Sequence, residues 1–189
     1  MNRDPKSLII ETMSKLKNKV AVVTGASKGI GAAIARHFAA EGAKVVVNYA
    51  SSKEGADKVV KEITDDGGIA IAVQADISKE ADVYRLFEET NTAFGGLDIL
   101  VNNAVYQGYS PIELISAETF HSSFNVNVLG PILTIQAALK GKSRGSRVDR
   151  QTLSRCRLQG RRPLRRRYFF LARVFAPVAD PPISVLSVD

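Results

Sequence analysis

Residues 24–31 read Thr24-Gly25-Ala26-Ser27-Lys28-Gly29-Ile30-Gly31, and this glycine-rich stretch decides the fold. The apolar run Val20–Val23 precedes it, and apolar residues recur after it at the spacing of an amphipathic helix. A strand that turns through glycines into a helix presents free backbone N–H groups and the positive end of a helix dipole, which suit a pyrophosphate. We therefore predict a dinucleotide site. Gly25 makes the tight turn, Gly29 lets the backbone approach the phosphates, and Gly31 lets the helix pack close to the strand.

Short apolar segments alternate with amphipathic segments along the first three quarters of the chain. We predict strands over residues 19–24, 44–49, 69–74 and 97–102. We predict helices over residues 29–41, 52–66, 78–94 and about 116–139. This alternation is typical of an α/β, Rossmann-like doubly wound parallel sheet with helices on both faces. Right-handed crossovers then give the strand order 3-2-1-4, which is an incomplete version of that fold.

The spacing Gly-x-x-x-Gly-x-Gly after a threonine resembles that of the short-chain dehydrogenase/reductase family. Four further motifs follow in the family's order, so that the resemblance covers about residues 16–140: Ala40–Val47, Val73–Ile77, Leu97–Ala104 and Val126–Gly130. The resemblance is to the classical branch, which includes 3-oxoacyl-acyl-carrier-protein reductases and glucose dehydrogenases. It implies an oxidoreductase that transfers a hydride between a carbonyl and an alcohol. The family usually has glycine after Asn-Asn-Ala, whereas this sequence has Val105.

The predicted strand at 44–49 ends without a carboxylate, which bears on the choice of cofactor. In Rossmann sites an acidic residue at that place binds the adenosine ribose and repels a 2′-phosphate. Lys28 adds a cation on the same side of the site, and similar family members with this pairing usually prefer NADP(H). We therefore predict NADP(H) over NAD(H), with a solvated surface side chain as the alternative for Lys28.

The resemblance assigns further residues to the cofactor. Asp76 is expected to contact the adenine with Ile77 packed nearby, and a carboxylate that caps the next helix is the alternative for Asp76. Asn103 and Ala104 are expected to line the nicotinamide ribose. The predicted cofactor-binding residues are, in all, Gly25, Ser27, Lys28, Gly29, Ile30, Gly31, Asn48, Tyr49, Ser51, Asp76, Ile77, Asn103 and Ala104.

The family's catalytic residues are a serine, a tyrosine and lysine spaced as Tyr-x-x-x-Lys, and a helical asparagine. Asn127 matches the asparagine, which in the family kinks a helix and organises a proton-relay water; a bond to backbone or water is the alternative. Beyond residue 140, where the resemblance places the other three, the only lysine is Lys142. Ser154 and Tyr168 lie at about the right separation, but Ala172 stands where the lysine belongs. We therefore predict Asn127 as the only catalytic residue present, and an impaired enzyme.

The composition changes abruptly after residue 140. Residues 1–140 contain 11 Lys, 3 Arg and 16 acidic residues, whereas residues 141–189 contain 1 Lys, 11 Arg and 3 acidic residues. We predict a flexible extension over 1–15, an NADP(H)-binding Rossmann half over 16–140, and an irregular arginine-rich tail over 141–189. The tail is either a basic segment that binds nucleic acid through Arg161–Arg167 or the product of out-of-frame translation. We prefer out-of-frame translation, because the family motifs and the helical periodicity end, and the lysine content falls, at the same point.

The remaining features narrow the function to three hypotheses. The single cysteine, Cys156, excludes an internal disulfide and favours a cytoplasmic location. No apolar run is long enough to span a membrane. His37 and His121 lack metal-ligand spacing. The hypotheses are an oxidoreductase for a small carbonyl or alcohol, an inactive nucleotide-binding remnant, and a basic-tailed interaction protein. A sheet that ends at the strand 97–102 leaves an open edge, so we expect poor solubility rather than the family's usual homo-oligomer.

Overall fold

A computed structural model describes residues 15–108, 111–140 and 184–187 of the chain. The strands are β1 (Val20–Val23), β2 (Lys44–Tyr49), β3 (Ile69–Gln74), β4 (Ile99–Asn102) and β5 (Ser184–Ser187). The helices are α2 (Gly29–Ala40), α3 (Lys53–Asp65), α4 (Glu80–Phe94), α5 (Ala117–Phe124) and α6 (Gly130–Lys140). A 3-10 turn, Ile112–Leu114, precedes α5, and a π-helical turn, Asn125–Leu129, joins α5 to α6.

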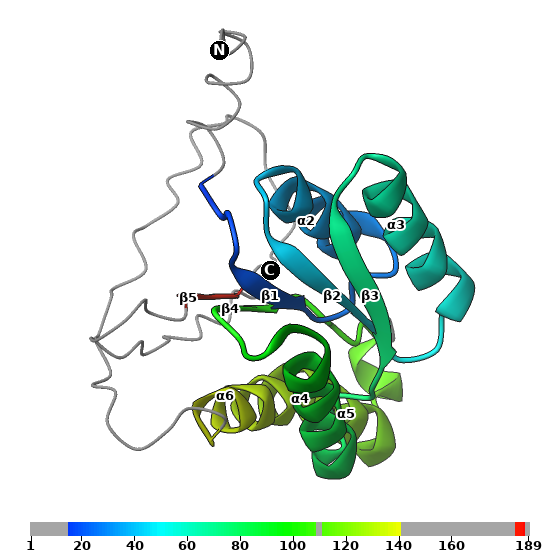
Figure 1. Ribbon diagram of the computed structural model, residues 1–189. Coiled ribbons are helices and arrows are strands. Elements are labelled where there is room, and N and C mark those ends of the chain that lie inside the picture. The colour runs from blue at the N-terminus through cyan, green and yellow to red at the C-terminus, as the bar shows by residue number, and fades with distance from the viewer. Residues whose placement is uncertain (1–14, 109–110, 141–183, 188–189) are drawn as a thin grey trace, which may run out of the picture.

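The strands form one sheet in the order β3-β2-β1-β4-β5, and every neighbouring pair is parallel. The predicted α/β fold and the order 3-2-1-4 are therefore confirmed. Helices α2 and α3 cover one face of the sheet, and α4 and α6 cover the other (Figure 1). Because both faces are covered, the central strands are continuous apolar runs, and all four residues of β1 and of β4 are buried.

The expectation that β4 has an open edge is wrong. β5 pairs with it in parallel, from Ile99 opposite Ser184 to Asn102 opposite Ser187. A run of four residues, more than 80 positions from its partner and behind an arginine-rich stretch, carries too weak a pattern to be recognised as a strand from the sequence. Residues 1–14, Ser154, Tyr168 and the arginine run 161–167 lie outside the described residues.

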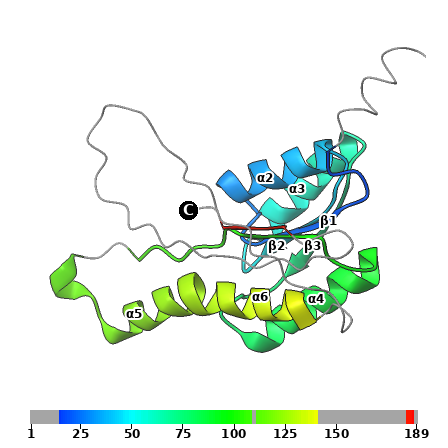
Figure 2. The ribbon, with the colours of Figure 1, turned by 90° about the vertical axis from the view of Figure 1, so that its left-hand side faces the viewer.

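The predicted helix 116–139 is two helices joined end to end. The π-helical turn Asn125–Leu129 interrupts it and contains Asn127. π-Turns inside helices admit one extra residue and are frequent at functional sites. Figure 2 shows the two helices as one rod under the sheet, with α5 projecting beyond the ends of the strands. None of the helices in the described ranges combines the length and the apolar character that crossing a membrane requires.

Candidate functional site

Hydrogen bonds tie the glycine turn after β1 to the end of β4. The Thr24 hydroxyl oxygen accepts from the backbone N–H groups of Asn103 (2.9 Å) and Ala104 (3.1 Å). In return, the Asn103 side-chain amide donates to the carbonyl oxygens of Thr24 (2.9 Å) and Gly25 (3.1 Å). The crossovers from β1 and β4 leave toward opposite faces of the sheet at this edge, and a crevice for a ligand opens at such a point.

Two glycines of the turn sit where the chain passes close to itself. A Cβ on Gly25 would lie 2.8 Å from the Cα of Ala104, and a Cβ on Gly31 would lie 2.4 Å from the side-chain nitrogen of Asn103. Gly29 differs, because it has a φ of +59° and a Cβ there would meet nothing within 4 Å. The backbone at Gly29 therefore borders open space, where a ligand can approach it.

The N-terminus of α2 has neither an acidic residue in its first turn nor a side-chain cap, whereas the starts of α3, α4 and α5 each have at least one of these groups. Lys28 at its start makes no capping hydrogen bond, and its first turn has no acidic residue. By contrast, α3 and α4 have acidic residues in their first turns, and Ser116 caps α5 by accepting from the N–H of Thr119. Free N–H donors at the positive end of a dipole are the donor set that binds a phosphate, so this end of α2 fits the pyrophosphate of a dinucleotide.

The predicted cofactor residues at the end of β2 divide into buried and exposed ones. Asn48 is 1% exposed; its amide oxygen accepts from the N–H of Gly25 (3.3 Å), and its nitrogen donates to the carbonyl of Ala75 (3.0 Å). Tyr49 is buried too, whereas Ser51 and Lys28 are exposed. Asn48 therefore braces the glycine turn from inside the sheet, and the two exposed side chains are free to face a ligand.

Asp76 has its carboxylate engaged at the end of β3. One oxygen accepts from the backbone N–H (3.0 Å) and the hydroxyl (2.7 Å) of Ser78, and the other lies 3.6 Å from the ammonium of Lys79. The backbone N–H of Asp76 donates to the carboxylate of Asp82 (2.9 Å), and this bond, with that from Arg85, lowers the pKa of Asp82. Asp76 thus orders the loop before α4.

Asn127 holds the loop that follows β4. Its side-chain oxygen accepts from the backbone N–H of Tyr106 (2.8 Å), and its nitrogen donates to the carbonyl of the same residue (3.0 Å). This pair of bonds joins the π-turn to the crevice edge and uses both polar atoms of the Asn127 side chain.

Ile77 is buried against Gly130, where a Cβ would lie 2.7 Å from an Ile77 methyl carbon. No group of metal-binding side chains occurs among the described residues.

Sequence reasoning overlooked one Tyr-x-x-x-Lys spacing, from Tyr49 to Lys53. Tyr49 is buried at the end of β2, while Lys53 starts α3 and bonds Asp57 at 2.5 Å, an interaction that raises the pKa of Lys53. A strand residue and a helix residue do not share a helix face, and a buried phenol meets no substrate. Tyr49 and Lys53 therefore serve the fold, and their spacing does not make them a catalytic pair. Sequence reasoning also overlooked Thr24, because the sequence marks it only as the threonine before the first glycine.

Comparisons with known proteins agree with this geometry. A family model described as short chain dehydrogenase matches residues 19–148, which extends past residue 140, where the motifs end. A protein of Methylorubrum extorquens named as an uncharacterized oxidoreductase is 55% identical over 136 residues, covering 72% of this chain and 55% of that protein. A 3beta-hydroxysteroid dehydrogenase of Eggerthella lenta is 50% identical over 115 residues, covering 61% of this chain and 44% of the relative.

Solved structures give the same result. A short chain dehydrogenase from Burkholderia cenocepacia in complex with NADP superposes with a TM-score of 0.65 at 42% identity, covering 67% of this chain and 52% of that one. The chain thus spans about half the length of the relatives it matches.

Proposed function

The chain belongs to the short chain dehydrogenase family, and from this premise we propose that it binds NADP(H) at the carboxyl edge of its sheet, as the nucleotide half of an oxidoreductase for a small carbonyl or alcohol. The observation that carries the proposal is the N-terminus of α2, which is uncapped, free of acidic residues and preceded by a turn locked to β4. Gly29 supports the same proposal, because a Cβ there would meet nothing within 4 Å, so a ligand can approach the backbone at this helix end.

In this proposal each group of residues holds one part of the cofactor. The N–H groups of Gly29, Ile30 and Gly31 hold the pyrophosphate. The 2′-phosphate lies beside the Lys28 ammonium and the hydroxyls of Ser27 and Ser51. Asp76 and Ile77 border the adenine, and Asn103 and Ala104 border the nicotinamide ribose. When bound, the cofactor supplies or accepts the hydride.

A second candidate is a nucleotide-binding protein without catalytic turnover, and the sequence favours it. Beyond residue 140 no tyrosine is followed four residues later by a lysine, and in Tyr49–Lys53, the pair with this spacing in the described residues, the tyrosine is buried. Asn127 by itself only fixes a loop. The proposal includes a cytoplasmic location, which the single cysteine favours. It does not include nucleic acid as a partner.

Calorimetric titration of the purified full chain with NADPH and with NADH tests the proposal. We expect NADPH to bind more tightly, and Lys28→Ala to reduce the difference, because the ammonium interacts with the 2′-phosphate alone. The matched control is Lys58→Ala, an exposed lysine on α3, which leaves both affinities unchanged. Tighter binding of NADH, or no binding of either nucleotide, contradicts the proposal.

A further inference from the structure

The first turn of α3 touches the glycine turn through a residue without a side chain. Gly55 is the third residue of α3 and is half-buried. A Cβ at Gly55 would lie 2.8 Å from the carbonyl oxygen of Ser27 and 2.8 Å from the hydroxyl oxygen of Ser52. The Ser52 hydroxyl can rotate away, but the Ser27 carbonyl is backbone and cannot. The chain at Ser27 therefore rests directly on the α3 backbone.

The helix itself gives no reason for glycine at this position. Gly55 does not have a positive φ, and glycine disfavours a helix relative to alanine. The other end of the same helix shows the opposite case: Gly67 has a φ of +81°, and a Cβ there would meet nothing within 4 Å. Gly67 therefore serves the backbone conformation, whereas Gly55 serves the close approach of Ser27.

The residues on both sides of Ser27 are held by other parts of the fold. The N–H of Ala26 donates to the carbonyl of Asn48 (2.8 Å), and the N–H of Ala32 donates to the carbonyl of Lys28 (3.4 Å). Ala26 and Ala32 are also fully buried. A side chain at position 55 consequently displaces Ser27 and changes the direction in which Lys28 leaves it, while the helix end at Gly29–Gly31 stays near its place.

We propose that Gly55 is a positioning residue for the cofactor's 2′-phosphate, because it sets where Ser27 and Lys28 lie relative to α3. This inference rests on the proposed function, which assigns that phosphate to these two residues. Gly55 touches no part of the cofactor itself. Its substitution changes the discrimination between phosphorylated and unphosphorylated ribose more than it changes nucleotide binding as a whole.

The test compares Gly55→Ala with Gly67→Ala, two added methyl groups at opposite ends of one helix. The probes are 2′,5′-ADP and 5′-AMP, which differ by the 2′-phosphate, titrated calorimetrically into the full chain. For Gly55→Ala we expect a loss of about tenfold in affinity for 2′,5′-ADP, the size of one charge-assisted contact, and little change for 5′-AMP. Gly67→Ala lowers the melting temperature because of its positive φ and leaves the affinity ratio unchanged. An unchanged ratio in Gly55→Ala overturns the inference.

Further variants identify the contact. Of the two atoms that a Cβ at position 55 would meet, Ser52→Ala removes the Ser52 hydroxyl oxygen and leaves the Ser27 carbonyl oxygen. If the carbonyl is the obstacle, the ratio of the affinities for 2′,5′-ADP and 5′-AMP stays low when Ser52→Ala is added to Gly55→Ala. Return of the ratio to that of Ser52→Ala alone overturns the assignment. Should Gly55→Ala fail to fold alone, it is combined with Ser27→Gly, which removes the Ser27 Cβ that would lie 3.4 Å from a Cβ at position 55, and the double variant is compared with Ser27→Gly. A lower ratio in the double variant supports positioning, and equal ratios contradict it.

The outcomes also separate this inference from the proposed function. Equal affinity of the unmodified chain for 2′,5′-ADP and 5′-AMP means that the proposed NADP(H) preference is wrong. A preference that Lys28→Ala removes and Gly55→Ala keeps means that only the role of Gly55 is wrong.

Discussion

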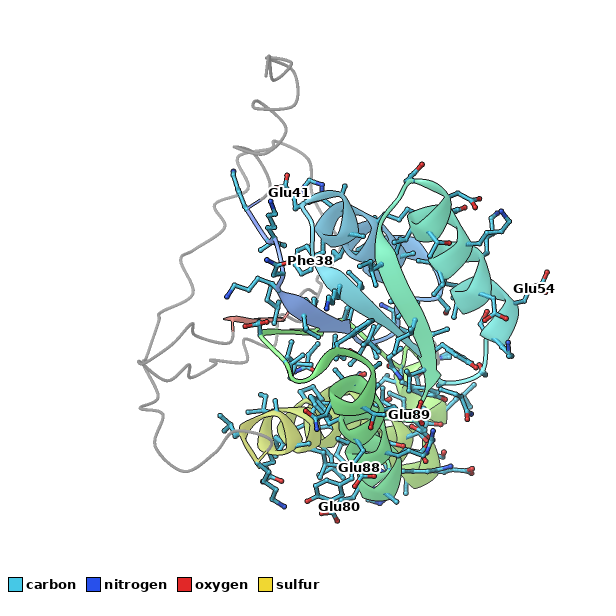
Figure 3. The ribbon with its side chains drawn as sticks, viewed as in Figure 1. Phe38, Glu41, Glu54, Glu80, Glu88 and Glu89 are labelled. Atoms are coloured by element: carbon cyan, nitrogen blue, oxygen red, sulfur yellow. The ribbon has the colours of Figure 1, made fainter. Side chains whose placement is uncertain are left out.

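The two helical layers of the molecule differ in their outer surfaces. The outer side of α2 and α3 is charged, with ion pairs between Arg36 and Glu62 and between Lys53 and Asp57, and Figure 3 shows Glu54 reaching outward from the end of α3. The α5–α6 rod instead exposes large apolar side chains, each between 39% and 47% exposed: Phe120, Phe124, Leu129, Ile132 and Leu139. The first layer has an ordinary solvated surface, whereas an apolar face of this kind is typical of surfaces that pack against something further.

The difference arises because the rod has two apolar faces. Ala137 and Ala138 are buried, Ile135 packs against a cluster that includes buried strand residues, and Leu133 packs against a cluster that includes Ile77 and Val83 of the α4 side. Leu133 and Ile135 therefore lie on the covered face of the rod, whereas Phe120 and Phe124 lie on its exposed face. The π-turn sets the phase of α6 relative to α5, so the face that touches the sheet cannot be read from an unbroken helical period.

The largest expected effect separates binding from catalysis. We predict that the purified chain reduces no carbonyl compound with NADPH above background, because the tyrosine–lysine pair of the family is missing beyond residue 140. The measurement is NADPH oxidation in a preparation that binds NADPH by calorimetry, so that unfolded protein does not account for inactivity. A turnover number of about 1 per second or more is ordinary for enzymes and contradicts the prediction.

The second prediction compares two threonines that bond to the end of β4, Thr24 from the glycine turn and Thr134 from α6. Thr24 and Thr134 are both fully buried; Thr24 accepts from two backbone N–H groups, whereas Thr134 donates to the side-chain oxygen of Asn102 (2.8 Å). Thr24→Val leaves two N–H groups that cannot turn away, so we expect it to lower the free energy of unfolding by about 2–4 kcal/mol. Thr134→Val leaves a single side-chain acceptor, the Asn102 oxygen, without its donor, and we expect about 1–2 kcal/mol.

Chemical denaturation of both variants measures the difference. The isosteric valine keeps the packing, so the hydrogen bonds are the main change. A larger loss for Thr134→Val would show that the α6 side, rather than the glycine turn, fixes the end of β4.

Local sequence patterns predicted most of the fold, and tertiary contacts explain the remainder. The bounds of β2 and β3 are as predicted, because alternation with helices and glycine-marked ends determines them. The helix predicted from residue 78 begins at Glu80, since Ser78 bonds the Asp76 carboxylate instead of capping the helix. The strand predicted from 97 begins at Ile99, because the Asp98 side chain takes the N–H of the neighbouring strand.

The candidate site was predictable only where its residues are close in sequence. The glycine turn and the absence of a carboxylate after β2 could be identified directly. The roles of Thr24 and Asn127 could not, because each depends on a segment 21 or more residues away. Likewise, the close approach of Gly55 to Ser27 depends on how α3 packs on the turn, which the sequence does not signal.

The third prediction tests the exposed face of the rod. Ile132→Lys places a charge on a side chain that is 47% exposed, so we expect a change of less than about 0.5 kcal/mol in the free energy of unfolding, with less self-association at high concentration. Light scattering measures association and thermal melting measures stability. Ile63→Lys, in the buried face of α3, is the matched control and unfolds the protein. A large loss of stability in Ile132→Lys would show that this face is covered within the monomer.

The smallest effect concerns acid. Asp82 accepts from the N–H of Asp76 and from Arg85, and these bonds lower its pKa in the folded chain. A carboxyl group with a depressed folded pKa contributes stability above its unfolded pKa, near 3.9, and loses that contribution as the pH falls through the lower folded value. We therefore expect Asp82→Asn to be slightly less stable than the parent at neutral pH and equally stable well below pH 3, with most of the change in between. Glu89→Gln, which removes the other partner of Arg85 on the exposed side of α4, is the control and leaves the acid limb unchanged. Melting temperatures between pH 2 and 7 measure the effect, and a constant difference between parent and Asp82→Asn across that range would show that the bond to Asp76 does not depend on the charge of Asp82.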